Sequence, residues 1–218
     1  MTCCGKIKYM ATKQGNGKDI VKKEVKKVLL DVACGLNKKE GYIGIDYVKA
    51  KGVDIVHDLN KYPWPIKSNS VDQIHCSHYI EHLPHEVKGY PNKDGWFLFF
   101  DEINRILKKP EFSPESPNVP ISGFADFFAP YYSSMRAWWD PTHRRAISEM
   151  SFQYLNKNWR DINKLDHYHV DSDFNFSYGY SLNGSFSQKN EELRAFAVRH
   201  YNNVVDDINV RLWKNVVG

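Results

Sequence analysis

Residues 74–86 read IHCSHYIEHLPHE and place four histidines and one cysteine in thirteen positions. Side chains of these types bind transition metals and transfer protons, so a metal centre and a catalytic centre are the two chemistries to weigh. The first half of the stretch has the composition of a strand. Because side chains alternate between the faces of a strand, His75 and Ser77 would point one way and Cys76 and His78 the other. These four side chains therefore do not converge on one ion.

The second half of the stretch has helical spacing. Glu81 and His85 are four residues apart, as are His78 and His82, and a helix would bring each pair together. Such a pair can hold a metal, but the HExxH pattern is absent and no third ligand is evident. The alternative is that these side chains hydrogen-bond a loop and a helix N-terminus, where Glu81 is favourable beside the helix dipole. We therefore predict that no metal is bound or required here.

Small and acidic residues end three short apolar runs. The first run ends in small residues at 33–35, the second at Asp46 and the third at Asp58–Leu59. In open α/β sheets ligands bind beyond the carboxyl ends of the strands. Asp46 is well placed to accept hydrogen bonds from ribose hydroxyls, and an acid followed by an apolar residue suits the amine and the face of a purine. Neither GxGxxG nor GxxxxGK[ST] occurs, so the pattern predicts a nucleoside site without a phosphate cradle.

The segment DPTHRR, residues 140–145, is a further candidate. His143 and Arg144 could act as acid and base or orient an acidic substrate, and they could equally hold a loop in place. Aromatic residues over 131–139, Tyr132 among them, lie close in sequence to arginines. This mixture suits a planar or anionic acceptor of small to moderate size. The alternative is that the aromatics pack against a sheet while the arginines face solvent.

The positions of these candidates depend on elements that alternate between strand and helix. Strands are predicted at 28–35, 42–46, 53–59 and 71–77, each a short run with valine or isoleucine. Residues 95–109 have apolar side chains at helical spacing, and residues 148–159 predict a second helix capped by Ser148. Strands that alternate with helices favour a parallel sheet covered on both faces.

The second half of the chain changes character. Prolines at 110, 114, 117 and 120 make residues 110–120 a loop insertion, and a fifth strand is predicted within 124–132. Residues 173–182 and 206–214 alternate apolar and polar side chains, as half-exposed antiparallel strands do. We expect this pair to close an otherwise parallel sheet, in a single domain over residues 1–218.

Composition limits the classes of protein. The chain has 218 residues, 42% hydrophobic residues and a net charge of +4, much of it from a basic lead-in over residues 1–27 that holds eight lysines. No apolar run is long enough to span a bilayer and no signal peptide is evident, so we expect a cytoplasmic protein without a membrane partner. The four cysteines lack CxxC spacing, which favours reduced thiols. The basic arm could touch nucleic acid, but a solvated lead-in is the favoured interpretation.

Three segments, taken in order, resemble successive motifs of the class I S-adenosylmethionine-dependent methyltransferases: LLDVACGLNKKEGYIGID, DIVHDLNKYPWPIKSNSVDQIHCSHYIEHL and EINRILKKP. The similarity is greatest to a small branch with an S-H-x-x-E-H-L segment and, downstream, a D-P-T-H segment, and it extends from about Lys27 to Asn156. It implies an α/β, Rossmann-like fold with a mostly parallel seven-stranded sheet closed by an antiparallel strand pair. Ala33 and Leu36 stand where the family commonly has glycine, and the proline-rich insertion replaces its usual K-P-G-G turn.

The resemblance also implies roles for individual residues. S-adenosylmethionine would be the cofactor, with Asp46 at its ribose, Asp58 and Leu59 at its adenine, and Ser77 and His78 where the fourth strand meets the reacting methyl. The full set of cofactor-binding candidates is Asp31, Ala33, Cys34, Gly35, Asp46, Tyr47, Asp58, Leu59 and Ser77. The catalytic candidates are His78 and His143, and the substrate-binding candidates are Arg144 and Tyr132. Cys34 is expected to be a small loop residue, not a nucleophile.

The predicted function is methyl transfer from S-adenosylmethionine to an unidentified acceptor by in-line displacement. Two alternatives stay open. One is a protein of the same fold that binds S-adenosylmethionine without transferring its methyl, as a regulatory or binding module. The other is a nucleic-acid methyltransferase, which the basic arm suggests. Methyltransferases that act on exocyclic amines of bases usually carry an [DNS]-P-P-[YFW] sequence after the fourth strand, whereas this chain has SHYI there.

Overall fold

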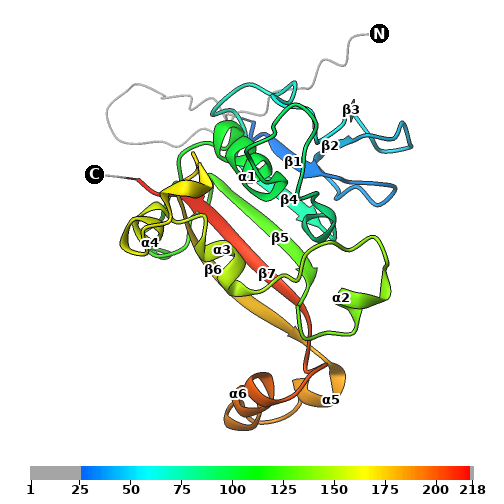
Figure 1. Cartoon of the computed structure of the whole chain (residues 1–218), viewed down its shortest axis with the longest axis vertical. Coiled ribbons are helices and arrows are strands. Elements are labelled where there is room, and N and C mark those ends of the chain that lie inside the picture. Colours follow the sequence, from blue (N-terminus) through cyan, green and yellow to red (C-terminus); the bar gives the residue numbers. More distant parts are fainter. Residues whose placement is uncertain (1–25, 217–218) are drawn as a thin grey trace, which may run out of the picture.

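The computed structural model describes residues 26–216 of the chain (Figure 1). The basic lead-in predicted over residues 1–27 lies, except for its last two residues, outside the described residues, as do Cys3 and Cys4. None of the helices in residues 26–216 has the length and apolarity that a membrane crossing requires.

Seven strands form one sheet in the order β3-β2-β1-β4-β5-β7-β6. Strands β1 to β5 pair in parallel, whereas β7 is antiparallel to both of its neighbours, β5 and β6. This arrangement confirms the predicted mostly parallel sheet that an antiparallel pair closes. The strands are β1 (Leu29–Val32), β2 (Ile43–Asp46), β3 (Ile55–Val56), β4 (Gln73–Ser77), β5 (Phe124–Pro130), β6 (Phe174–Leu182) and β7 (Val205–Lys214).

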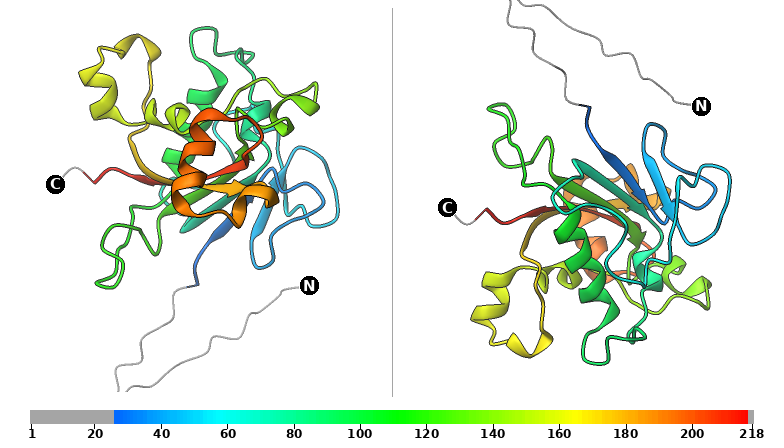
Figure 2. Two further views of the ribbon diagram at one scale, coloured as in Figure 1. Left: turned by 90° about the horizontal axis from the view of Figure 1, so that it is seen from below. Right: turned by 90° about the horizontal axis from the view of Figure 1, so that it is seen from above.

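The helices are short except for α1 and α6. They are η1 (Ile80–His82), α1 (Gly95–Ile106), α2 (Arg136–Trp139), α3 (Glu149–Gln153), α4 (Lys157–Ile162), η2 (Asp166–Tyr168), α5 (Gly184–Ser187) and α6 (Glu191–His200). The last two lie together at the far end of the β6–β7 pair, away from α1 (Figures 1 and 2).

Helix α1 forms where the apolar spacing predicts it. Its N-cap is Asp94, whose carboxylate accepts a hydrogen bond from the Trp96 backbone N–H at 2.7 Å and so satisfies one of the free donors of the first turn. The helix predicted over 148–159 is instead two helices. Asn156 adopts an extended conformation between α3 and α4, and its side chain caps α4 by accepting from Trp159 N–H at 2.9 Å. A side chain that caps well thus interrupts an otherwise helical pattern.

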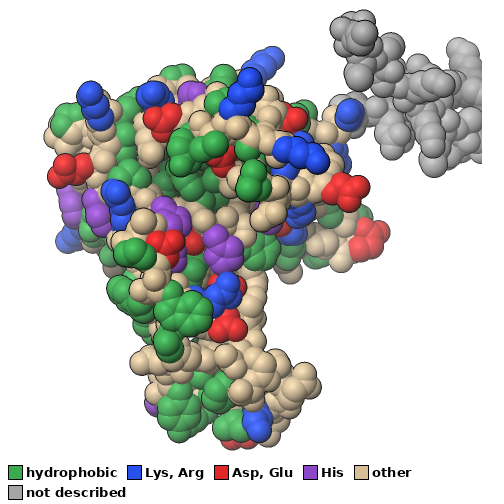
Figure 3. Space-filling view, turned by 90° about the vertical axis from the view of Figure 1, so that its right-hand side faces the viewer, with side chains coloured by type: hydrophobic (Ala, Val, Ile, Leu, Met, Phe, Trp, Pro, Cys, Tyr) green, Lys and Arg blue, Asp and Glu red, His purple; other side chains and the backbone are tan. Residues whose placement is uncertain are grey.

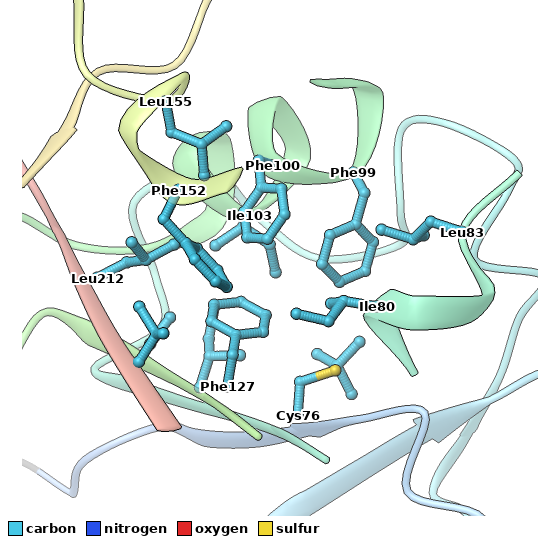
Figure 4. Close-up of a cluster of buried hydrophobic side chains, with 14 of the residues drawn as sticks. Cys76, Ile80, Leu83, Phe99, Phe100, Ile103, Phe127, Phe152, Leu155 and Leu212 are labelled. Carbon is cyan, nitrogen blue, oxygen red and sulfur yellow. The ribbon is translucent and has the colours of Figure 1, made fainter. Parts of the chain in front are cut away.

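Alternate residues of the strands build an apolar core beneath α1 and α3. Figure 4 shows aromatic side chains from both helices meeting β5 and β7. Phe127 of β5 is fully buried, and its ring centroid lies 5.1 Å from that of Phe100 and 6.2 Å from that of Phe99, both on α1. Phe152 of α3 is packed against Phe100 at 6.0 Å. Edge-to-face contacts of this kind fix α1 and α3 on one face of the sheet.

The opposite face of the sheet corrects one expectation. It carries a polar row that the strand registers align, with Asp31, His75, Asp126 and Arg211 on adjacent strands. Right-handed crossovers would place the helices of the β1–β2 and β2–β3 connections on this face. In residues 26–216 those two connections, and the β3–β4 connection, contain no helix. The prediction of a sheet covered by helices on both faces is therefore wrong for the described chain.

Removal of the Phe127 ring tests this account of the core. Phe127→Ala is expected to lower the free energy of unfolding by about 3–5 kcal/mol, because the ring is fully buried and its neighbours cannot fill the void. Urea unfolding followed by tryptophan fluorescence would measure the loss. The control is Phe112→Ala, since Phe112 is 42% exposed in the proline-rich insertion and should change stability by no more than about 0.5 kcal/mol. Equal losses in the two variants would contradict the assigned core.

Candidate functional site

A cavity of about 420 Å³ opens at the carboxyl ends of β1, β2, β3 and β4. The parallel registers put Val32 of β1 beside Ile45 of β2 and Cys76 of β4, so the loops that follow these strands start side by side. The cavity joins six of the predicted site residues with four that the prediction did not include. Its lining residues are Ala33, Asp46, Tyr47, Asp58, Leu59, Asn60, His78, Tyr79, His82 and Pro84.

Asp46 is held rigidly at this cavity. Its carboxylate is buried, with one oxygen accepting from the Gly35 N–H at 3.0 Å and the other from the Val48 N–H at 3.1 Å. Two charge-assisted hydrogen bonds offset part of the cost of burying the charge. Because each carboxylate oxygen can accept two hydrogen bonds, capacity for a ligand remains on both.

The chain turns sharply where β1 and β4 end, on the two sides of the cavity centre. Ala33 follows β1 with φ 56° and His78 follows β4 with φ 52°, and Gly35 also has a positive φ of 52°. For residues with a Cβ this left-handed conformation is uncommon and costs on the order of 1 kcal/mol. Ala33 thus adopts a conformation that glycine would adopt without strain, which explains why small residues end the first strand.

Asp31, Cys34, Gly35 and Ser77 do not line the cavity. Asp31 accepts from the Lys39 backbone N–H at 2.7 Å and so fastens the β1–β2 connection, and burial raises its pKa. Cys34 is buried next to Gly44 of β2. Burial, helped by the carboxylates of Asp31 and Asp46, raises the pKa of the Cys34 thiol to about 11. These residues shape the loop beneath the cavity.

The stretch after β4 forms less helix than its spacing predicts. Only the single turn η1 (Ile80–His82) follows, and His85 contacts Asp94 at 3.2 Å, not Glu81. The expected pairing of Glu81 with His85 through a helix is therefore wrong, because the helical turn ends at His82 before another turn can form. His78 instead reaches Glu81, with its Nδ1 3.5 Å from Oε1, and this contact raises the pKa of His78.

A distant segment completes the surroundings of Glu81. The backbone N–H groups of Arg144 and Arg145 donate to the Glu81 carbonyl at 2.8 and 3.1 Å. These bonds bring His143 against η1, where its ring lies 4.7 Å from that of His82 and its Nε2 is 4.0 Å from Glu81 Oε1. One ligand atom from each of Glu81, His82 and His143 lies within 4.8 Å of the others. His143 is thus a possible third ligand that the sequence did not reveal, and the absence of a bound metal stays a prediction.

The arginines after His143 differ from each other. Arg145 donates to the carbonyls of Leu83 and Pro84 and to Asp94, and so holds the segment in place, a role that the sequence analysis considered only for His143 and Arg144. Arg144 is exposed and lines a separate cavity of about 360 Å³ with Trp96 and other aromatic residues. Tyr132 lines a third cavity, near α6. The structure does not bring Arg144 or Tyr132 into the cavity that contains Asp46 and His78.

The sequence prediction did not include four of the residues that line the cavity: Asn60, Tyr79, His82 and Pro84. All of them follow β3 or β4 by a few residues. The signal that could have found them is the same strand-end rule, extended from the last strand residue into the loop beyond it. Figure 3 shows histidine and acidic side chains next to each other across the middle of one face of the molecule.

The fold is similar to that of an S-adenosylmethionine-dependent methyltransferase of known structure. A methyltransferase of this class from Archaeoglobus fulgidus is similar over 86% of both chains, with a TM-score of 0.54 and 15% identity. The phosphoethanolamine N-methyltransferase 2 of Haemonchus contortus with S-adenosylmethionine bound has a TM-score of 0.43 and 12% identity over 88% of this chain and 50% of that one. The plantazolicin methyltransferase BpumL with S-adenosylhomocysteine bound has a TM-score of 0.45 and 14% identity over 87% and 76%.

No protein-family model and no curated protein sequence matches the chain. At 15% identity, the similarity to the Archaeoglobus fulgidus protein shows the fold alone.

The raised thiol pKa values predict unreactive cysteines. With a pKa of about 11, Cys34 stays protonated as the pH rises to 8, where on the order of one thiol in 10³ is ionised. Because the thiolate is the reactive form, iodoacetamide at pH 8 should modify Cys34 at least about 100-fold more slowly than glutathione. Cys76 is buried and its thiol pKa is also raised, so it should react equally slowly. Mass spectrometry of a Cys3→Ser/Cys4→Ser variant would measure both rates, and modification as fast as that of glutathione would refute the burial.

Proposed function

We propose that this protein is an S-adenosylmethionine-dependent methyltransferase. The observation that carries the proposal is the cavity at the ends of β1, β2, β3 and β4, which unites Asp46, Asp58–Leu59 and His78. Its volume of about 420 Å³ lies in the range of small-molecule sites. Acidic groups, an apolar surface and a loop of small residues are the chemistry that a charged nucleoside with a methionine tail requires.

Asp46 would bind the ribose. Its two oxygens are fixed by backbone N–H groups and retain acceptor capacity for two neighbouring hydroxyls. Leu59, which is buried, would cover one face of the adenine, while Asp58 would accept from the exocyclic amine. Asp58 is itself positioned by a hydrogen bond from the Asn60 N–H at 3.1 Å. Tyr47 lies at the rim of the same cavity.

The methionine part would lie over the loop at residues 33–35. Small side chains there allow a ligand to approach the backbone, and the positive φ values of Ala33 and Gly35 turn that backbone at the cavity edge. Asp31 and Cys34 support the loop from below, and Ser77 ends the neighbouring strand.

The cofactor supplies a methyl group already activated by the sulfonium charge, so the residues of the chain mainly have to align an acceptor with it. His78 and His82 line the side of the cavity opposite Asp46 and Asp58 in the strand order, and we assign the methyl-transfer end to them. His143 supports this end through its contact with His82. Arg144 and Tyr132 remain proposed contacts for a small or moderate-sized acceptor that extends beyond the cavity.

Replacement of Asp46 tests the proposal directly. S-adenosylmethionine or S-adenosylhomocysteine should bind the wild-type chain, and Asp46→Ala should weaken that affinity by roughly 1.5–3 kcal/mol, because charge-assisted hydrogen bonds to the ribose are lost. Isothermal titration calorimetry measures both values. Asp161→Ala, at an exposed ion pair of α4, is the matched control and should bind as the wild type does.

One further variant separates cofactor binding from folding, and one further assay decides between the remaining functions. Asp46→Asn keeps the shape of the side chain, so a loss of affinity without a lowered melting temperature separates binding from folding. A broad acceptor panel, with oligonucleotides included, then distinguishes methyl transfer from cofactor binding alone. No binding of either cofactor form by the wild-type chain would refute the proposed function.

A further inference from the structure

Glu81 has an unusual environment for a buried acid. Its side chain is 2% exposed, and neither carboxylate oxygen has a hydrogen-bond partner among residues 26–216. Burying an ionised carboxylate without hydrogen bonds is strongly unfavourable, so a cation or a proton must compensate it. Of the basic side chains in the described chain, only two histidines come within 4.0 Å of this carboxylate, with His78 Nδ1 at 3.5 Å and His143 Nε2 at 4.0 Å.

The hydrogen bonds of His143 leave its Nε2 free to bind an ion. Nδ1 of His143 lies 2.9 Å from the Ala137 carbonyl oxygen. A carbonyl can only accept, so Nδ1 carries the proton and, in the neutral ring, Nε2 has a lone pair. That nitrogen is the one that faces Glu81.

The hydrogen bonds of His82 fix its ring proton in the same way. Its Nδ1 lies 3.0 Å from Thr142 Oγ1 and 3.3 Å from the Thr142 carbonyl oxygen, which again fixes the proton on Nδ1. The Thr142 hydroxyl donates its own proton to Asp140 at 2.7 Å and so accepts from His82. Histidines that bind metals characteristically donate their other ring N–H to a carbonyl, a carboxylate or a similar acceptor.

We propose that Glu81, His82 and His143 form a binding site for one divalent transition-metal ion of the zinc class. Two imidazole nitrogens and one carboxylate, with a fourth position open, are the ligand set of catalytic zinc sites, and the same set also suits other divalent first-row ions. Ligand bonds of about 2.0–2.1 Å place tetrahedral ligands about 3.3 Å apart. The present atoms lie within 4.8 Å, so the three side chains close in on the ion as it binds.

The site has access to the proposed reaction. His82 lines the same cavity as Asp46 and His78, so an ion held by His82 lies at the methyl-transfer end. This step rests on the proposed function. An acceptor with an oxygen, nitrogen or sulfur atom at the open position would lose its proton to water. The bond from that atom to the methyl carbon would then form as the carbon–sulfur bond of S-adenosylmethionine breaks, leaving neutral S-adenosylhomocysteine.

Metal binding can be measured without any cofactor, so its failure is distinct from failure of the proposed function. The full chain, with Cys3 and Cys4 replaced by serine, is stripped with a chelator and titrated with Zn²⁺ in competition with a chromogenic chelator. One Zn²⁺ per chain should bind. Glu81→Gln, His82→Ala and His143→Ala should each weaken binding by more than the roughly 10–100-fold that loss of an outer hydrogen-bond partner costs. Thr142→Val, which removes such a partner of His82, should fall within that range.

His85→Ala is the matched control, because His85 lies in the same stretch but contacts Asp94 and should leave zinc affinity unchanged. Co²⁺ in place of Zn²⁺ should give visible absorption bands of a tetrahedral site that disappear in His143→Ala. Absence of stoichiometric zinc in the wild type would overturn the proposal and indicate that protonated His78 or His143 neutralises Glu81. Equal affinity in the wild type and the three ligand variants would also overturn it and place the metal elsewhere.

Discussion

The candidate site depends on the parallel pairing of β1 with β4 in the middle of the sheet. These two strands are adjacent although β2 and β3 lie between them in the chain, so the strand order reverses at this pair. The chain leaves β1 toward β2 and β3, and it leaves β4 toward β5. Loops that depart in opposite directions open a crevice between them, which is where ligands bind in open α/β sheets. The register that puts Val32 beside Cys76 fixes Ala33 and His78 at the two sides of this crevice.

Segment 140–147 is the second determinant of the site, and it acts through backbone bonds. Two successive N–H groups of this segment converge on the Glu81 carbonyl, and the Arg145 side chain reaches the N-cap Asp94 of α1. The segment is thereby tied both to the loop after β4 and to the helix that covers the core. These bonds hold His143 beside His82, although His143 lies in a loop.

The parts that were predictable from sequence are those whose signal is local. Short apolar runs and the spacing of α1 identify their elements, and the strand ends locate six residues of one cavity. Asn156 shows the limit, since a capping side chain within a helical pattern can end one helix and start the next. The helical turn after β4 was overestimated for a related reason: spacing alone does not show where hydrogen bonding stops.

The remaining features arise only in three dimensions. Nothing near Glu81 in the sequence indicates that His143, about sixty residues later, contacts it, because that contact follows from β5 returning the chain to the same edge of the sheet. The separation of Arg144 from the cavity is set by its neighbour, since Arg145 takes the inward position and its hydrogen bonds. That residues 26–216 place no helix on one face of the sheet could not be inferred either, because alternating strands imply connections but not their conformation.

The buried acids of the described chain differ in whether the fold compensates the charge of their carboxylates. Asp72 is paired with Lys108 at 2.8 Å, Asp31 accepts a backbone N–H and Asp46 accepts two. In each of these cases the fold itself supplies compensation for the buried charge. Among buried carboxylates in residues 26–216, Glu81 is distinct because both of its oxygens lack a hydrogen bond.

The fold compensates the charges of Asp31, Asp46 and Asp72, whereas it leaves the Glu81 carboxylate without a hydrogen bond and places potential ligand atoms of His82 and His143 near it. The deficit at Glu81 is therefore better explained by an ion that the site receives than by imperfect packing. A packing defect would not require that the Nδ1–H groups of both His82 and His143 have acceptors of their own, Thr142 and the Ala137 carbonyl, so that both Nε2 atoms keep a lone pair.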